Sequence, residues 1–177
     1  MKQSVLIKSL EAYVKAHRAF AESLINIDEQ KLNQQPADGG WNVLQCIEHL
    51  NRYGDFYLKE VGGKVKKATN FSNDQNFKAG FFGKLFTSMM LPKKGMIKMK
   101  TFADKNPDAK ILDLNVIHKF IKQQKEWEEI LKKCQLLNLN KNKCSLTLPL
   151  LKMNMGSTLQ FVIYHNERHV VQAQRLL

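Results

Sequence analysis

The spacing of apolar residues constrains this chain most, because it repeats every three or four positions over several long stretches. Such a repeat places the apolar side chains on one face of an α-helix. The first stretch predicts a helix over about 4–27, whose inner face carries small or apolar residues: Leu6, Leu10, Tyr13, Val14, Ala21 and Leu24.

A second helix is predicted after the turn-rich segment 34–40. Asn42 is suited to the N-cap, and Gln45 three residues later completes a capping box. We expect this helix to run to about Val61 and to end at Gly62-Gly63, since glycine is common where helices stop. Its inward stripe would hold four side chains that are not simply aliphatic: Gln45, His49, Tyr53 and Phe56.

Two further helices are predicted in the second half of the chain. One begins near Asp113 and runs to about Cys134, and the other begins at Gly156 with a capping box over 157–160 and runs to Arg175. Residues 64–110 between them and the first pair lose the helical period, apart from an apolar segment over 81–91 that predicts a short packed helix. We therefore expect an all-α fold, an up-down four-helix bundle with a long crossover between its second and third helices, in one domain over 1–177.

The amino-acid composition agrees with an all-α fold and bears on which partners the protein binds. The nine Gly and four Pro residues are too few for an all-β sandwich. The net charge of +12 comes from 24 Lys and only 4 Arg. Because planar bidentate recognition of phosphates and bases prefers Arg, we do not expect specific nucleic-acid binding.

The cysteine pattern and the lengths of the apolar segments indicate the cellular compartment of the protein. The three cysteines form no Cys-x-x-Cys motif, which argues against a disulfide framework and against a thiolate zinc cage. Charged residues interrupt the first 20 residues, and no window reaches the roughly 20 apolar residues of a membrane span. We predict a protein of the reducing cytoplasm.

His165 and His169 stand four positions apart and so share one face of the last helix, about 6 Å apart along its axis. Two imidazoles at this spacing can bind one metal ion, and a third ligand has to come from another helix. His49, on the inward stripe of its helix, is our candidate. Three neutral imidazoles would hold Zn, Ni, Fe or Mn and leave a coordination position open, as in catalytic sites. Asn166 follows His165, so this is not the His-Glu-x-x-His motif of metalloproteases.

The run Gly-Trp-Asn-Val-Leu-Gln-Cys-Ile-Glu-His-Leu over 40–50, together with His-Asn-Glu-Arg-His-Val-Val-Gln over 165–172, resembles the DinB superfamily. The match includes Trp41, all three histidines, Arg168 and Gln172. The resemblance implies a helical bundle in which His49, His165 and His169 bind a divalent metal, with water completing the shell. It also implies a small-molecule substrate, because relatives are supposed hydrolases or transfer low-molecular-weight thiols, as bacillithiol transferases do.

Two interpretations of the histidines stay open. One is a metal-dependent enzyme, a hydrolase or a thiol transferase. The other is a metal-free bundle that binds a ligand or partner and keeps the histidines as polar packing. We interpret His17 as a hydrogen-bonded core or near-site histidine and His118 as a surface residue.

Residues 64–110 allow three interpretations: a packed crossover, a lid over the bundle mouth, and a patch that lies on anionic lipid. If the segment is a lid, Phe82 and Met89 contact the substrate together with Tyr53. Apolar residues beyond those that one interior needs also predict a homodimer.

Overall fold

The computed structural model describes residues 1–71, 74–92, 101–107, 111–148 and 150–177, and these are mostly helical. The all-α prediction is confirmed at this level, with one small sheet that we did not predict. In chain order the elements are α1 (Gln3–Leu24), α2 (Glu29–Leu32), α3 (Val43–Lys66), α4 (Phe81–Met90), the short 3₁₀ turn η1 (Ala103–Lys105), α5 (Asn115–Cys134), β1 (Lys143–Ser145), β2 (Lys152–Asn154) and α6 (Met155–Gln174).

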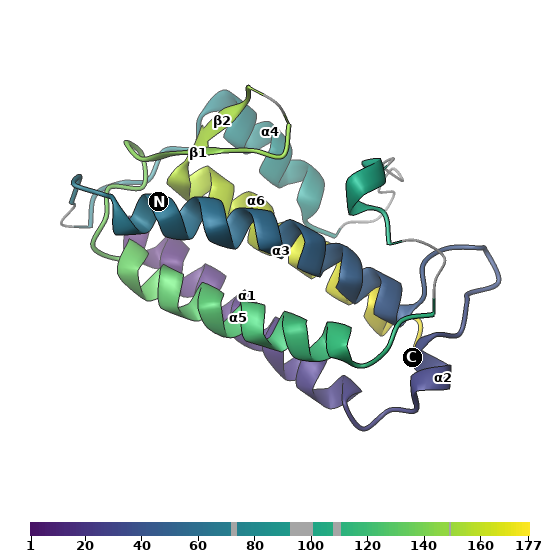
Figure 1. Ribbon diagram of the computed structural model, residues 1–177. Coiled ribbons are helices and arrows are strands. Elements are labelled where there is room, and N and C mark those ends of the chain that lie inside the picture. Colours follow the sequence, from purple (N-terminus) through teal and green to yellow (C-terminus); the bar gives the residue numbers. More distant parts are fainter. Residues whose placement is uncertain (72–73, 93–100, 108–110, 149) are drawn as a thin grey trace.

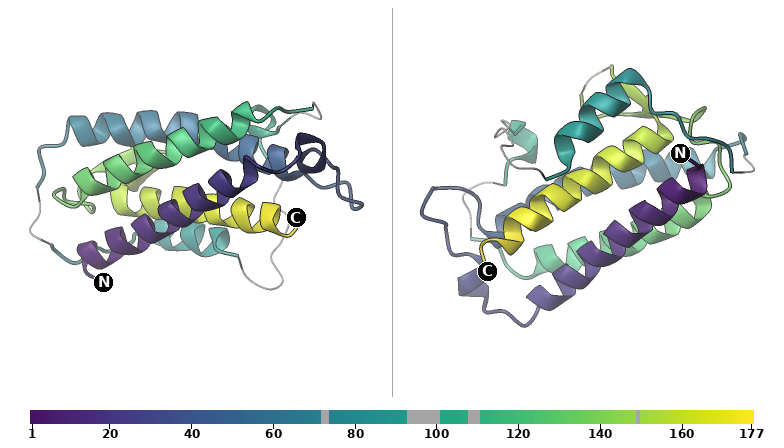
Figure 2. Two further views of the ribbon diagram at one scale, coloured as in Figure 1. Left: turned by 90° about the horizontal axis from the view of Figure 1, so that it is seen from below. Right: turned by 180° about the vertical axis from the view of Figure 1, so that it is seen from behind.

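The four long helices pack side by side, each against two others (Figure 1, Figure 2). Helices α1 and α3 each contact α5 and α6. The side chains between them form two buried apolar clusters. One surrounds Tyr57 and Trp127, and the other surrounds Leu44 and Phe120. The apolar face predicted for the first helix points into these clusters, which is why that sequence period predicted the helix correctly.

Helix α3 begins as predicted but ends later. The Asn42 side chain accepts from the Gln45 N–H, and the Gln45 side chain accepts from the Asn42 N–H, so the capping box is confirmed. The predicted stop at Gly62-Gly63 is wrong, because the helix continues to Lys66. Val61 is fully buried, and this packing outweighs the cost of about 1 kcal/mol for each glycine in a helix.

The start of α6 also differs from the prediction. Its N-cap is Asn154, whose side chain accepts a hydrogen bond of 3.0 Å from the Ser157 N–H. The predicted capping box from Ser157 to Gln160 is therefore wrong. Ser157 lies inside the helix and is buried against Gly83, at a place where a β-carbon on Gly83 would clash with the serine side chain. Ser157 thus serves the packing of α4 on α6.

The long connection between α3 and α5 contains the predicted short helix. Helix α4 runs along α6 (Figure 2). The antiparallel pair β1–β2 precedes α6 and contacts both α3 and α6. Within the described residues, no helix is both long and apolar enough to cross a membrane.

Candidate metal centre

Three histidines from two helices meet between α3 and α6. One ring nitrogen from each of His49, His165 and His169 lies within 4.8 Å of the others, and we call this group the histidine cluster. The Nε2 atoms of His49 and His165 are 3.2 Å apart. The residues that the sequence analysis selected from segments more than a hundred positions apart are thus brought together.

The ring orientations of two of these histidines are held by oxygen acceptors. Nδ1 of His49 lies 2.8 Å from the Lys105 carbonyl oxygen, and Nδ1 of His169 lies 2.9 Å from Oε1 of Gln172. An oxygen of this kind can only accept, so each Nδ1 carries the proton and donates it. In a neutral imidazole the lone pair then resides on Nε2, the atom that is left to bind a ligand.

His165 completes the group with a different environment. Its side chain is buried, and its Nδ1 has no hydrogen-bond partner in the described part of the chain. The 3.2 Å between its Nε2 and that of His49 is close to the roughly 3.3 Å expected for two nitrogens bound to one tetrahedral ion at about 2.0 Å. The spacing therefore fits a shared metal ion.

Burial keeps the cluster uncharged at neutral pH. It lowers the pKa of His49 to about 4 and that of His169 to about 3, and it lowers the pKa of His165 well below its ordinary value. The nearby positive charges of Arg52 and Arg168 act in the same direction. Neutral imidazoles are the form that binds metal ions.

Aromatic rings enclose the cluster. The Trp41 ring centroid is 4.6 Å from that of His49 and 5.6 Å from that of His169, so this tryptophan lies against the site itself. The Tyr53 ring is 4.5 Å from His165, and burial raises the pKa of its hydroxyl to about 12. The Phe161 ring stacks on His165 at 6.2 Å. The phenol of Tyr53 thus keeps its proton and can donate it in a hydrogen bond.

Sequence reasoning missed the turn that covers one side of the cluster. Besides the Lys105 carbonyl that accepts from His49, the Asn106 carbonyl accepts a 2.6 Å hydrogen bond from Arg52, which also pairs with Glu48. The Lys105 ammonium lies 6.0 Å from the Tyr53 ring centroid. A backbone carbonyl carries no residue-type signal, so no motif in this segment pointed to the contact.

The three residues predicted to contact the substrate do not all lie beside the histidine cluster. Tyr53 borders the cluster, as described. Met89 lies at the far end of α4, where its carbonyl accepts a 3.1 Å hydrogen bond from Arg168. Phe82 is half-exposed on α4 and stacks on Phe86, so it is not part of the group around the histidines.

The two remaining histidines named in the sequence analysis, His17 and His118, agree with their interpretations. His17 is buried and its Nε2 lies 2.9 Å from Oε2 of Glu167, while His118 is exposed on α5. Cys46 is fully buried, and burial raises the pKa of its thiol to about 12. Glu48 pairs with Arg52 instead of orienting an imidazole.

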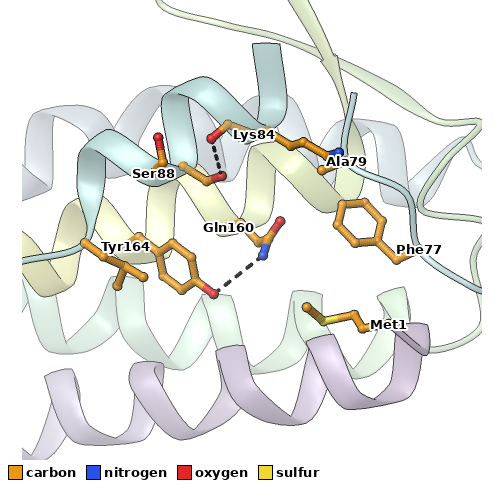
Figure 3. A pocket seen from close by; sticks show the side chains of 9 residues that line it. Met1, Phe77, Ala79, Lys84, Ser88, Gln160 and Tyr164 are labelled. Atoms are coloured by element: carbon orange, nitrogen blue, oxygen red, sulfur yellow. Dashed lines mark hydrogen bonds between the residues drawn. The ribbon is translucent and has the colours of Figure 1, made fainter. Parts of the chain in front are cut away.

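A separate hollow of about 310 Å³ lies between α4, α6 and the start of α1 (Figure 3). Its lining includes Phe77, Lys84, Gln160 and Tyr164, and none of the clustered histidines. In Figure 3 the Gln160 amide reaches toward the Tyr164 hydroxyl, at 3.5 Å. This hollow and the histidine cluster are therefore at different places.

The family model described as the DinB superfamily matches residues 12–173, nearly the whole chain. The chain belongs to the DinB superfamily. The resemblance seen in the motifs around Trp41 and the three histidines is thereby confirmed. No curated protein and no solved structure matches this DinB-superfamily chain.

Proposed function

We propose that this DinB-superfamily protein is a divalent-metal-dependent enzyme that acts on a small molecule, as a hydrolase or a low-molecular-weight-thiol transferase. The observation that carries the proposal is the convergence of three uncharged imidazoles, two of which, His49 and His169, have Nδ1 bound to an oxygen acceptor outside the cluster. His49, His165 and His169 would hold the ion. Superfamily membership supports this, since DinB-like proteins are generally metal-dependent.

The ion would supply Lewis acidity, which lowers the pKa of a water or thiol ligand. The protein's own residues would do the rest. The backbone oxygen of Lys105 and the side-chain oxygen of Gln172 fix the orientations of two of the imidazoles. Trp41 and Phe161 exclude water from their sides of the site, which strengthens electrostatic interactions there. Tyr53, protonated at neutral pH, is placed to donate a hydrogen bond to a bound substrate.

The cysteine nearest in sequence to the clustered histidines, Cys46, is not suited to act as the nucleophile. The potential ligand group in the described residues contains histidines only. The thiol of Cys46 is fully buried with its pKa raised to about 12, so it stays protonated. The nucleophile would therefore come from solvent or from a thiol cosubstrate, in keeping with both reaction types.

The charges around the cluster favour an anionic substrate. Arg52 and Lys105 each act on His49 through their positive charge, and Arg168 does the same on His165 and His169. Glu48 and Asp104 partly balance the first two cations. A carboxylate-bearing small molecule, such as an acidic thiol, would be attracted to this potential.

We also infer that the four long helices form the up-down bundle predicted from the sequence, in one domain. In that arrangement the ligands come from facing helices and converge in the interior, as metal sites in bundles do. The competing function is a metal-free bundle that binds a ligand or partner. It would keep the histidines only as polar packing.

Metal content separates the two functions. We expect protein purified without a metal-chelating tag to carry about one Zn, Ni, Fe or Mn ion per chain by elemental analysis. His169→Ala should lose most of it, because two ligands bind far more weakly than three. His118→Ala removes an exposed histidine from α5 and is the matched control, which should keep its metal.

A wild-type protein that fails to take up any of the four ions on addition would overturn the metal-dependent function and leave the metal-free bundle. Equal metal loss in His118→Ala would show unspecific binding and have the same consequence. With metal content established, hydrolysis of carboxylate-bearing esters and amides and transfer of acidic thiols are the activities to assay first.

A further inference from the structure

The outer face of α4 presents large apolar side chains to solvent. Phe81 is 78% exposed, Phe82 51% and Leu85 45%, while the inner side of the same helix buries Gly83 and Met90. A surface helix normally turns polar residues outward. Three exposed apolar residues within ten positions therefore mark this face as one that meets something other than water.

The β1–β2 hairpin extends this face. It lies beside α4 (Figure 1) and is tied to the start of that helix by two hydrogen bonds, from the Lys78 N–H to Asn140 and from the Asn154 side chain to the Lys78 carbonyl. Leu150, in the hairpin connection, is fully exposed. We define the α4–hairpin surface by its exposed apolar and basic residues: Phe81, Phe82, Leu85, Leu150, Lys78, Lys84, Lys143 and Lys152.

This surface is basic and its segments lack acidic residues. Residues 75–103 contain six Lys and no Asp or Glu, and residues 130–166 contain five Lys and no Asp or Glu. Lys78, Lys84, Lys143 and Lys152 are exposed. Glu60 of α3, which accepts from the Ser145 N–H, is the acidic group that the hydrogen bonds bring to the hairpin. Most of the net charge of +12 thus resides on these two segments.

The combination of charge and apolar exposure selects the partner. A second copy docked through the same face would bring Lys84 toward its own counterpart, which like-charge repulsion disfavours. A nucleic acid would gain little from Leu85 and Leu150, and the two segments have no Arg for phosphate or base recognition. An anionic bilayer accommodates both features, with acyl chains for the apolar side chains and headgroups for the lysines.

We propose that the α4–hairpin surface docks the protein on the surface of anionic membranes. Phe81, Leu85 and Leu150 enter the boundary between headgroups and acyl chains, while Lys84 and Lys152 remain at the level of the phosphates. The histidine cluster lies between α3 and α6 and shares no residue with the α4–hairpin surface, so docking and metal binding use separate residues.

Co-sedimentation with vesicles tests the proposal. The full-length protein should bind vesicles of phosphatidylcholine with phosphatidylglycerol, should bind vesicles of phosphatidylcholine alone much more weakly, and should be released by added salt. Lys84→Glu with Lys152→Glu should weaken the partition roughly 25-fold or more, since each lysine near an anionic surface contributes about a fivefold factor. Lys122→Glu with Lys125→Glu makes the same change of net charge on α5 and should have a much smaller effect.

A second pair of variants tests the apolar contact. Phe81→Asn with Leu150→Asn should reduce binding roughly tenfold or more. Both side chains are largely exposed, and asparagine tolerates the positive φ of 63° at position 150. Ile111→Asn with Leu136→Asn, exposed residues at either end of α5, is the matched control.

Several outcomes would overturn the proposal. One is equal binding to both vesicle types. Another is salt-sensitive retention on heparin without any vesicle binding, which would point to a soluble polyanion. A third is a doubled mass in light scattering that the Phe81 and Leu150 variant abolishes, which would assign the surface to a second copy. Unchanged melting temperature and metal content in the variants would show that lost vesicle binding does not reflect unfolding.

Discussion

His17 and the histidine cluster are both enclosed by the long helices, but they differ in what the imidazoles face. The His17 ring meets the Glu167 carboxylate at 2.9 Å and is fully buried. His49 and His169 instead face a backbone carbonyl and an amide oxygen through Nδ1. His165 has a neighbouring imidazole and no hydrogen-bond partner at Nδ1 among the described residues.

The difference teaches that burial alone does not distinguish a structural histidine from a ligand. A carboxylate partner occupies the Nε2 of His17, while its Nδ1, like that of His165, has no hydrogen-bond partner among the described residues. In His49 and His169 an oxygen acceptor occupies Nδ1, and the Nε2 of His49 faces another imidazole nitrogen, that of His165, instead of a carboxylate. Whether Nε2 is bound to a carboxylate therefore distinguishes His17 from the candidate metal ligands.

The largest expected effect in the histidine cluster is acid sensitivity. Burial lowers the pKa of His49 to about 4 in the folded protein, against 6.5 ordinarily. As the pH falls below 6.5 the unfolded chain therefore binds a proton before the folded one, and the folded state loses stability down to about pH 4. His49 alone should cost about 3 kcal/mol of the free energy of unfolding over this range.

Urea denaturation of metal-stripped protein at several pH values between 7.5 and 4 measures this loss. His49→Gln should make the profile less steep, because glutamine does not titrate, while His165 and His169 still contribute to the loss. If the variant lost stability with pH as steeply as the wild type, His49 would not contribute to the acid sensitivity of the cluster.

How much of this site the sequence predicted depends on whether a contact is made by a side chain or by the backbone. The clustered histidines have a residue type and a spacing that suggest metal binding, and a family motif surrounds them. The Lys105 carbonyl has neither, because any residue could supply it. The contact of Trp41 with His49 and His169 was not predicted either, since a tryptophan at the start of a helix does not reveal which ring it contacts.

In the fold, too, some features were predicted from the sequence and others were not. The long helices were predicted from the apolar period, which depends on burial on one face, and their packing then buries that face. The errors at Gly62-Gly63 and at Ser157 arose where tertiary contacts override local preference. The burial of Val61 favours continuation of α3 past the two glycines. Ser157 lies inside α6 because it packs against Gly83. Strands of three residues, as in β1 and β2, are too short for a period of two to register.

The His17 side of the comparison predicts a structural effect only. Glu167→Gln replaces a carboxylate acceptor by a neutral amide and should lower the free energy of unfolding by about 2 kcal/mol, as for hydrogen bonds to charged groups. Metal content should stay at the wild-type level. Loss of metal in this variant, measured by elemental analysis beside the urea curve, would mean that the His17 pair belongs to the metal centre.

The smallest effect concerns the orientation of a ligand. Gln172→Ala removes the acceptor that holds the His169 ring, so the imidazole gains freedom and its Nε2 spends less time aimed at the ion. We expect metal affinity to fall about tenfold, at the low end of the range for such partners because a neutral amide is a weak orienting group. Gln172→Glu retains an acceptor and should restore most of the affinity. Gln174→Ala, at an exposed position two residues on, should leave it unchanged. Affinities from competition with a chromogenic chelator measure all three, and an unaltered affinity in Gln172→Ala would show that packing against Trp41, at 5.6 Å between ring centroids, suffices to orient His169.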